Sequence, residues 1–228
     1  MMDLMTSVVN RYKAKEKLTR KEESEFTYSV YQFELHAKEV LRNDEAFGRF
    51  IRFVEEVENY SGKNSQKVHN SWQNLFRSID CYIEIGDDEA LPEEISSSLQ
   101  KLAKFYLMRV VGKPARTKKL ADRREVLWDT LAQISLYEMK AEILKEALSV
   151  FGNEKCRVEE RYGALLCVLT HWEKGDEKTT KLINQVRKNP PNEDFLMSIL
   201  DAEVDLGLLD PMAAMVELED YREANDEW

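Results

Sequence analysis

Histidine and cysteine are the side chains most able to bind metal ions, and the chain has only three of each. No histidine belongs to the zinc pattern H-E-x-x-H, and none follows a glutamate at the three-residue spacing of di-iron helical bundles. The cysteines lack metal-ligand spacing, and two of them fall about three turns apart on one expected helix, too far for a disulfide. The sequence therefore predicts no metal site and no cofactor. The residues concerned are His36, His69, His171, Cys81, Cys156 and Cys167.

Motifs of the common enzyme classes are also missing from the sequence. There is no glycine-rich phosphate loop and no G-x-S-x-G nucleophile elbow. Carboxylates are abundant, but they fall on helix faces expected to be solvated. No two of them are paired in an apolar setting, which is what raises a carboxyl pKa for acid–base catalysis. We therefore expect a protein without enzymatic activity.

The segment from Lys113 to Arg124 is rich in basic residues, which can neutralise phosphate groups. No aromatic side chains interleave them, as a stacking platform for a single strand would require. The sequence leaves three interpretations open: a nucleic-acid site, a solvated linker, and a strip that docks the acidic end of the chain. The candidate nucleic-acid residues are Lys118, Lys119, Arg123 and Arg124.

The last part of the chain, residues 193–228, is strongly acidic, with twelve acidic residues and one basic residue. Its apolar residues recur at helical spacing, which disordered acidic tails lack. We expect amphipathic helices with a negative outer face, whose methionines either form an adaptable binding surface or fill the core. The terminal tryptophan is either a frayed end or a docking anchor. The candidate partner-binding residues are Phe195, Ile199, Leu200, Met212, Met215 and Trp228.

Helices must position all of these residues, because glycine and proline are scarce and apolar residues recur every three or four positions. The clearest helical hairpin runs from Ser65 to Val111, with its turn between Gly86 and Pro92. Composition and periodicity predict an all-α protein, either a multi-helix bundle or an irregular helical array of about 9–11 helices.

Short polar residues predict where individual helices begin. Thr19 and Glu22 have the spacing of a capping box, and Asp210-Pro211 matches a cap followed by a first helical residue. A stripe that begins at Leu127 either ends near Tyr137 or runs on to Gly152. Further starts are predicted at Asn43, Asn153, Asp176 and Asn192, and one end at Gly207.

A break at Gly112 and Pro114 predicts two parts, unless the chain is one continuous domain. These are an N-terminal helical bundle, residues 1–112, and C-terminal helical hairpins with the acidic end, residues 113–228. No apolar run reaches the roughly 18 residues that a membrane span needs, and the N-terminus lacks the pattern of a secretory signal. With cysteines interpreted as reduced thiols, we expect a cytoplasmic protein that does not enter a membrane.

Four blocks in the first half of the chain follow a defined order. They are Tyr12, Leu18-Thr19-Arg20, the stretch 69–76 around Trp72, and Leu91-Pro92 leading to Leu99, Leu102 and Phe105. Over roughly residues 6–112 this order resembles the flagellar biosynthesis regulator FlaF family. That resemblance implies a small helical, non-enzymatic protein that works with flagellin, in its regulation or its delivery for secretion. It also implies a packed scaffold role for Trp72, Phe76, Leu91 and Pro92.

Together these patterns favour a non-enzymatic protein-binding module that acts as a chaperone, adaptor or regulator. The expected partner is another protein, flagellin if the family resemblance holds, or a second copy of the chain. The alternative is a helical nucleic-acid-binding protein that uses residues 113–124, and a steep loss of affinity with salt would distinguish it.

Overall fold

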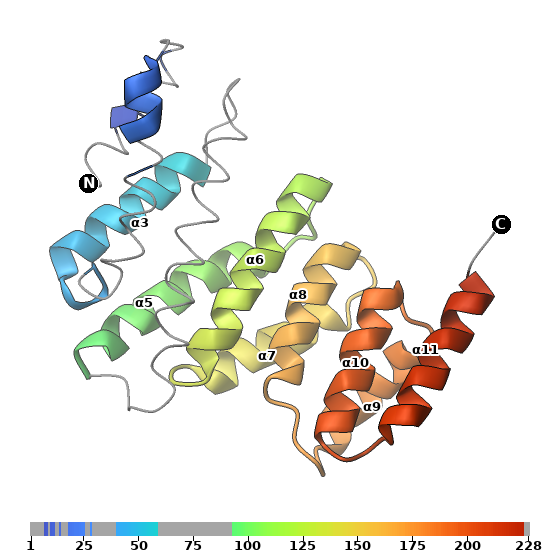
Figure 1. Ribbon diagram of the computed structural model, residues 1–228. Helices are drawn as coiled ribbons and strands as arrows, with labels where there is room; N and C mark the ends of the chain where they lie inside the picture. Colours follow the sequence, from blue (N-terminus) through green and yellow to red (C-terminus); the bar gives the residue numbers. More distant parts are fainter. Residues whose placement is uncertain are drawn as a thin grey trace. The chain divides into compact units, whose positions relative to one another are not determined.

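The computed structural model of the chain describes residues 7–8, 10–11, 14, 18–25, 28, 40–58 and 93–225. Every regular element in these ranges is a helix, which confirms the prediction of an all-α helical array (Figure 1). The helices are α3 (Asp44–Glu58), α5 (Glu93–Val110), α6 (Lys118–Ser135), α7 (Lys140–Phe151), α8 (Val158–Leu169), α9 (Glu177–Arg187), α10 (Glu193–Asp205) and α11 (Pro211–Asn225).

The chain divides into two compact units by its internal contacts. Unit 1 comprises residues 1–105 and 136–139, and unit 2 comprises residues 106–135 and 140–228. The division falls within α5 and also separates a short segment after α6, whereas the sequence places a single break after residue 112. The predicted domains 1–112 and 113–228 therefore stay a prediction.

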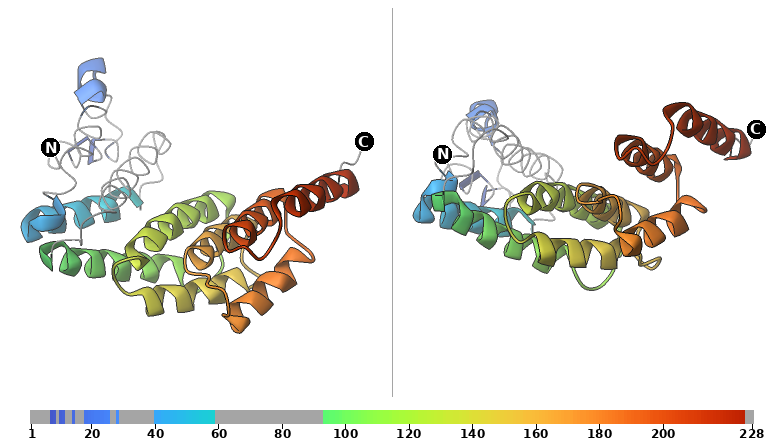
Figure 2. Two further views of the ribbon diagram at one scale, coloured as in Figure 1. Left: turned by 60° about the horizontal axis from the view of Figure 1, so that its bottom comes forward. Right: turned by 90° about the horizontal axis from the view of Figure 1, so that it is seen from below.

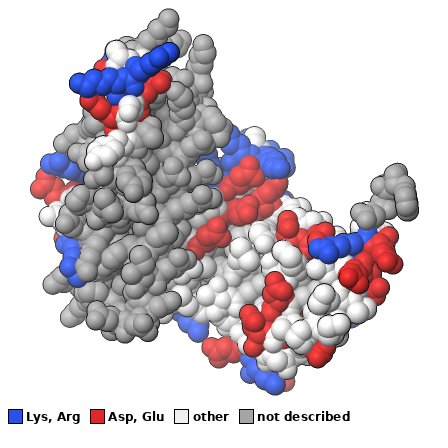
Figure 3. Space-filling model, in the orientation of Figure 1, with Lys and Arg blue, Asp and Glu red and all other residues white. Residues whose placement is uncertain are grey.

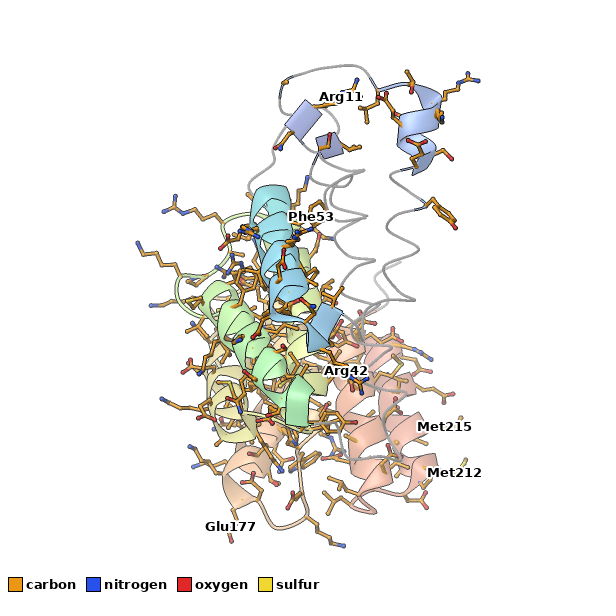
Figure 4. All side chains as sticks on the ribbon, turned by 90° about the vertical axis from the view of Figure 1, so that its left-hand side faces the viewer. Arg11, Arg42, Phe53, Glu177, Met212 and Met215 are labelled. Atoms are coloured by element: carbon orange, nitrogen blue, oxygen red, sulfur yellow. The ribbon has the colours of Figure 1, made fainter. Side chains whose placement is uncertain are left out.

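Unit 1 has its described core where α3 and the first part of α5 contribute large apolar residues. Phe50, Phe53 and Leu99 are almost fully buried there, and Phe53 is labelled on α3 in Figure 4. Asp44 at the start of α3 accepts a hydrogen bond from Lys101 of α5 at 2.9 Å. Spacing of three and four residues places the buried side chains on one face of each helix, as the sequence predicts.

Unit 2 is built from successive helices that alternate between two layers. In both views of Figure 2, α7 and α9 lie on one side, and α6, α8 and α10 lie on the other. The core between them consists of fully buried side chains, including Trp128, Phe151, Leu165 and Ile183. Such alternation lets each amphipathic helix bury its apolar stripe against its chain neighbours.

Most predicted helix ends are confirmed. Thr19 and Glu22 form the capping box, with each backbone N–H donating to the side chain of the other residue. Asn192 caps α10 by accepting from the N–H of Phe195 at 3.1 Å, and Asp210 accepts from the first amides of α11. Asn43 and Asp176 cap α3 and α9 in the same way, and Gly207 has the positive φ of 62° that follows a helix end.

The structure decides one open helix boundary and overturns another expectation. Of the two alternatives for the stripe from Leu127, the end near Tyr137 holds and the continuation to Gly152 does not, because α6 ends at Ser135 and Met139 has a left-handed backbone with φ of 55°. Asn153 does not begin the next helix; its side chain accepts from the N–H of Lys155, and α8 starts only at Val158. A short polar residue satisfies local amides in a turn as well as at a helix start.

The linker interpretation of residues 113–124 is also corrected. Residues 118–124 form the first two turns of α6, and Ala121 among them is fully buried. Several other predictions lie outside the described residues, namely the first helix and turn of the hairpin from Ser65 to Pro92. The FlaF-like residues Trp72, Phe76, Leu91 and Pro92 are among them, as are His36, His69 and Cys81.

Candidate interaction surface

The candidate partner-binding residues of the acidic segment divide into two groups. Phe195, Ile199 and Leu200 are buried in unit 2, so they are core residues and not part of an open binding face. The Phe195 ring packs against Tyr162 of α8, with ring centroids 5.5 Å apart, and Arg161 lies over its face. Their helical spacing predicts that they share a face, but spacing cannot distinguish a buried face from an exposed one.

Helix α11 carries the other group on an open surface. Met212, Met215 and Val216 have exposed fractions of 67%, 57% and 53%, and none of the residues of α11 is fully buried. Figure 4 shows the side chains of Met212 and Met215 extending away from the α11 ribbon. Exposed methionine is flexible and polarisable, which suits a surface that adapts to a partner. Trp228, the remaining candidate, lies outside the described residues.

The same outward face of α11 becomes acidic toward its end. Glu219 and Glu223 follow Met212 and Val216 at steps of three, four and seven residues, so they lie on the same side of the helix. In Figure 3 uncharged surface (white) covers the beginning of α11, and acidic side chains (red) gather toward its C-terminal end. The surface is therefore half apolar and half negative, and we call it the α11 face: Met212, Met215, Val216, Glu219, Asp220 and Glu223.

Ion pairs hold α11 against the rest of unit 2. Arg187 of α9 binds Glu217 of α11 through two parallel hydrogen bonds, one of them from Nε to Oε1 at 2.8 Å. The same guanidinium binds Glu203 of α10, which is almost fully buried. Arg222 of α11 donates two hydrogen bonds to Glu193, at 2.8 and 2.6 Å. The hydrogen bond from Arg187 lowers the pKa of Glu217, so this carboxylate stays charged and keeps the helix attached.

The candidate nucleic-acid residues are not all available to a ligand. Arg124 is mostly buried and binds Glu160, and its Nη1 also donates to the carbonyl of Lys113 at 2.9 Å. It does not dock the acidic end of the chain, since Glu160 belongs to α8. Lys118 and Lys119 are exposed, and Arg123 is half-buried. The nucleic-acid hypothesis therefore depends on Lys118, Lys119 and Arg123, and it stays a prediction.

One carboxyl group was missed by the sequence analysis. The pKa of Glu125 is raised to about 7, first because the side chain is desolvated and then because Asp129 and Asp122 lie beside it on α6. Glu159 of α8 and Asp194 of α10 add to the effect. Figure 3 shows acidic side chains along α6. The sequence analysis expected carboxylates on solvated helix faces, whereas Glu125 is half-buried; the spacing of Asp122, Glu125 and Asp129 was the available signal for the repulsion between them.

A serine and a histidine lie within hydrogen-bond distance of each other in unit 2. Ser135 Oγ lies 2.5 Å from His171 Nε2 and 2.5 Å from the carbonyl oxygen of Ala132. The hydroxyl has one proton for these two neighbours, and the tautomer of His171 sets which of them receives it. The neighbouring Cys167 is buried, and burial raises its pKa to about 12. The absence of enzymatic activity stays a prediction.

Within the described part of the chain, no three histidine, cysteine or acidic side chains are arranged to hold a metal ion. Among the same residues, no helix combines the length and apolar character needed to span a membrane. In comparisons with known proteins, no family model, curated protein or solved structure matches the chain. Function must therefore be inferred from the surface of the molecule itself.

Proposed function

We propose that the protein is a non-catalytic protein-binding module, an adaptor, chaperone or regulator, that presents the α11 face to a protein partner. The observation that supports this most is that Met212, Met215 and Val216 are all more than half exposed on one helix. An apolar surface of this kind is costly in water unless a partner covers it for part of the time. Helix-in-groove recognition uses such a stripe, with contacts at steps of three, four and seven residues.

The attachment of α11 supports the same proposal. Arg187 and Arg222 fix the helix through Glu217 and Glu193, so its orientation is set before a partner arrives. A preorganised surface loses less conformational entropy on binding than a disordered one.

The cytoplasm is the expected location, because the described cysteines, Cys156 and Cys167, are both free thiols.

The test compares two methionine variants of the purified full chain. Met212→Glu/Met215→Glu places charge on the α11 face, and Met108→Glu is the matched control because Met108 is 73% exposed on α5. A partner is first captured with the wild-type chain from its host, with flagellin included as a purified candidate. The double variant should weaken binding at least about tenfold, and the control should change it less than about twofold. Full affinity of the double variant would overturn the proposal.

A further inference from the structure

A groove crosses the surface of unit 2 between α7 and α9. It has a volume of about 600 Å³, and its floor is formed by Leu144 and Leu148 of α7 together with Leu182 of α9. Each helix contributes residues at steps of three, four and seven positions, so one face of α7 and one face of α9 converge on the groove. Since both helices belong to the same layer (Figure 2), the groove runs between neighbours. A floor of this kind fits an apolar helix face.

The rim of the groove is basic. Lys145 on one side and Lys178 and Lys181 on the other are exposed, and none of the described residues that line the groove is acidic. Lys145 has an acidic neighbour, Glu146, but their distance is 3.9 Å and the lysine side chain is 81% exposed, so this pair contributes little. An occupant that fits both the floor and the rim must therefore combine apolar and negative side chains.

The α11 face has this combination. Its first two turns present Met212, Met215 and Val216, and its last two turns present Glu219 and Glu223 with Asp220 beside them. The three carboxylates match the three lysines of the groove in number and opposite sign. The groove of the same molecule is not the site that α11 occupies, because α11 packs against α10 and is held there by Arg187. The occupant must come from another molecule.

We propose that the groove between α7 and α9 binds the α11 face of a second copy of the chain. This inference rests on the proposed function, since it names the partner of the same surface. The contact joins two different surfaces, so repeated copies form either reciprocal pairs or head-to-tail chains. One helix in one groove buries less than about 1,200 Å², the range of weak and transient complexes, so association is expected at micromolar concentration.

Charge reversal tests the proposal by sedimentation velocity of the full chain between about 1 and 200 µM, the range over which micromolar association is populated. One variant reverses the groove (K145E/K178E/K181E), and the other reverses the helix (E219K/D220K/E223K). Each variant alone should associate at least about tenfold more weakly than the wild type, because like charges then meet. All six side chains are exposed, so circular dichroism should show both variants folded as the wild type is.

An equimolar mixture of the two variants is the decisive measurement. In the mixture, the acidic α11 face of the groove variant meets the basic groove of the helix variant. The basic α11 face of the helix variant likewise meets the acidic groove of the groove variant. Association in the mixture should return to within about threefold of the wild type, a recovery that misfolding of either variant cannot produce. A wild-type chain that stays monomeric throughout, or a mixture without recovery, would overturn the proposal. If the chain is monomeric while Met212→Glu/Met215→Glu still loses a different partner, this inference fails and the proposed function stands.

Discussion

Arg187 and Glu217 face each other across α9 and α11 as a two-pronged ion pair, although thirty residues separate them in the sequence. Arginine is suited to this role because its planar fork matches both carboxylate oxygens. The same guanidinium also satisfies the buried Glu203 of α10, so one side chain connects three helices. The α11 face therefore depends on a residue that lies outside α11.

Arg187→Ala should release α11 and destabilise unit 2. Removing the guanidinium leaves the buried carboxyl group of Glu203 without its partner, which costs about 2–4 kcal/mol of unfolding free energy. The neighbouring Lys188 is exposed, and Lys188→Ala should cost less than about 0.5 kcal/mol. Urea unfolding measures the loss, and hydrogen exchange of residues 211–225 should accelerate in Arg187→Ala alone. Unchanged exchange in that segment would show that Arg187 does not hold α11.

Gly163 determines how closely α6 and α8 approach. A Cβ at this position would lie 2.8 Å from Glu125 Cα and 3.0 Å from Trp128 Cβ, closer than backbone and core atoms permit. Gly163→Ala should therefore force the helices apart and lower stability by about 1–3 kcal/mol, despite the better helix propensity of alanine. A Cβ added at Gly48 in α3 would meet no atoms within 4 Å, so Gly48→Ala is the control and should stabilise slightly. If Gly163→Ala and Gly48→Ala stabilised the protein equally, the close approach of α6 and α8 would not depend on Gly163.

The helices of this chain were largely predictable because their signals are local. Asn192 and Asp210 act as caps within their own turns, and the stripes of α5 and α10 can be counted along the sequence. The break at Met139 was not predictable in the same way, since a left-handed methionine has no sequence signature. It depends on the packing of the segment that contains it: Glu138 accepts hydrogen bonds from Ser96 and Gln100 of α5.

The candidate site was predicted less well, because burial is a property of the whole fold. Phe195 and Met212 both lie on apolar stripes of the acidic segment, yet Phe195 is fully buried and Met212 is 67% exposed. The difference depends on which helices pack against each stripe. Helix α8 packs against the stripe of α10 that contains Phe195, and such a tertiary contact cannot be counted along the sequence. The groove between α7 and α9 was missed for the same reason, since its lysines and leucines come from two helices that the sequence does not bring together.

Glu125 should make stability depend on pH in a direction unusual for a carboxyl group. Its pKa is about 7 in the folded protein and about 4.5 when unfolded, so the folded state holds the proton more tightly. The contribution of the Glu125 carboxyl group to the free energy of unfolding is complete below pH 4.5 and is lost as the pH rises to about 7. Glu125→Gln removes this loss, so the variant should exceed the wild type by about 1 kcal/mol at pH 8, with solvent screening of a half-buried group taken into account.

The measurement for Glu125 is urea unfolding of wild type and Glu125→Gln at several pH values between 4 and 8. The difference in unfolding free energy should grow between pH 4.5 and 7 and then stay constant. Asp122→Asn removes one of the negative neighbours that raise this pKa. In a chain that keeps Glu125, this change should shift the pH-dependent loss of unfolding free energy to lower pH. A difference between wild type and Glu125→Gln that does not vary with pH would refute the raised pKa.

Glu160 and Arg124 test whether the basic segment is structural or a ligand site. Glu160 is 1% exposed, and its Oε2 accepts from the N–H of Ala115 at 2.8 Å while Oε1 binds Arg124. Glu160→Gln replaces an accepting oxygen with a donor and leaves a mostly buried guanidinium without its counter-charge. We expect a loss of about 3 kcal/mol in urea unfolding. Glu159→Gln is the control, since Glu159 has a 3.9 Å contact with an exposed lysine and a repulsive interaction with Glu125, and the change should cost less than about 0.5 kcal/mol.

The partner substitution separates the two roles of Arg124. If the arginine is structural, Arg124→Ala should destabilise the chain about as much as Glu160→Gln, and combining the two should cost less than their sum because both remove one interaction. Lys118→Ala and Lys119→Ala should leave stability unchanged, so they are the variants with which nucleic-acid binding can be tested without unfolding. An Arg124→Ala chain with wild-type stability would mean that the guanidinium is not needed by Glu160, and Arg124 would then rejoin Lys118 and Lys119 as a candidate phosphate-binding residue.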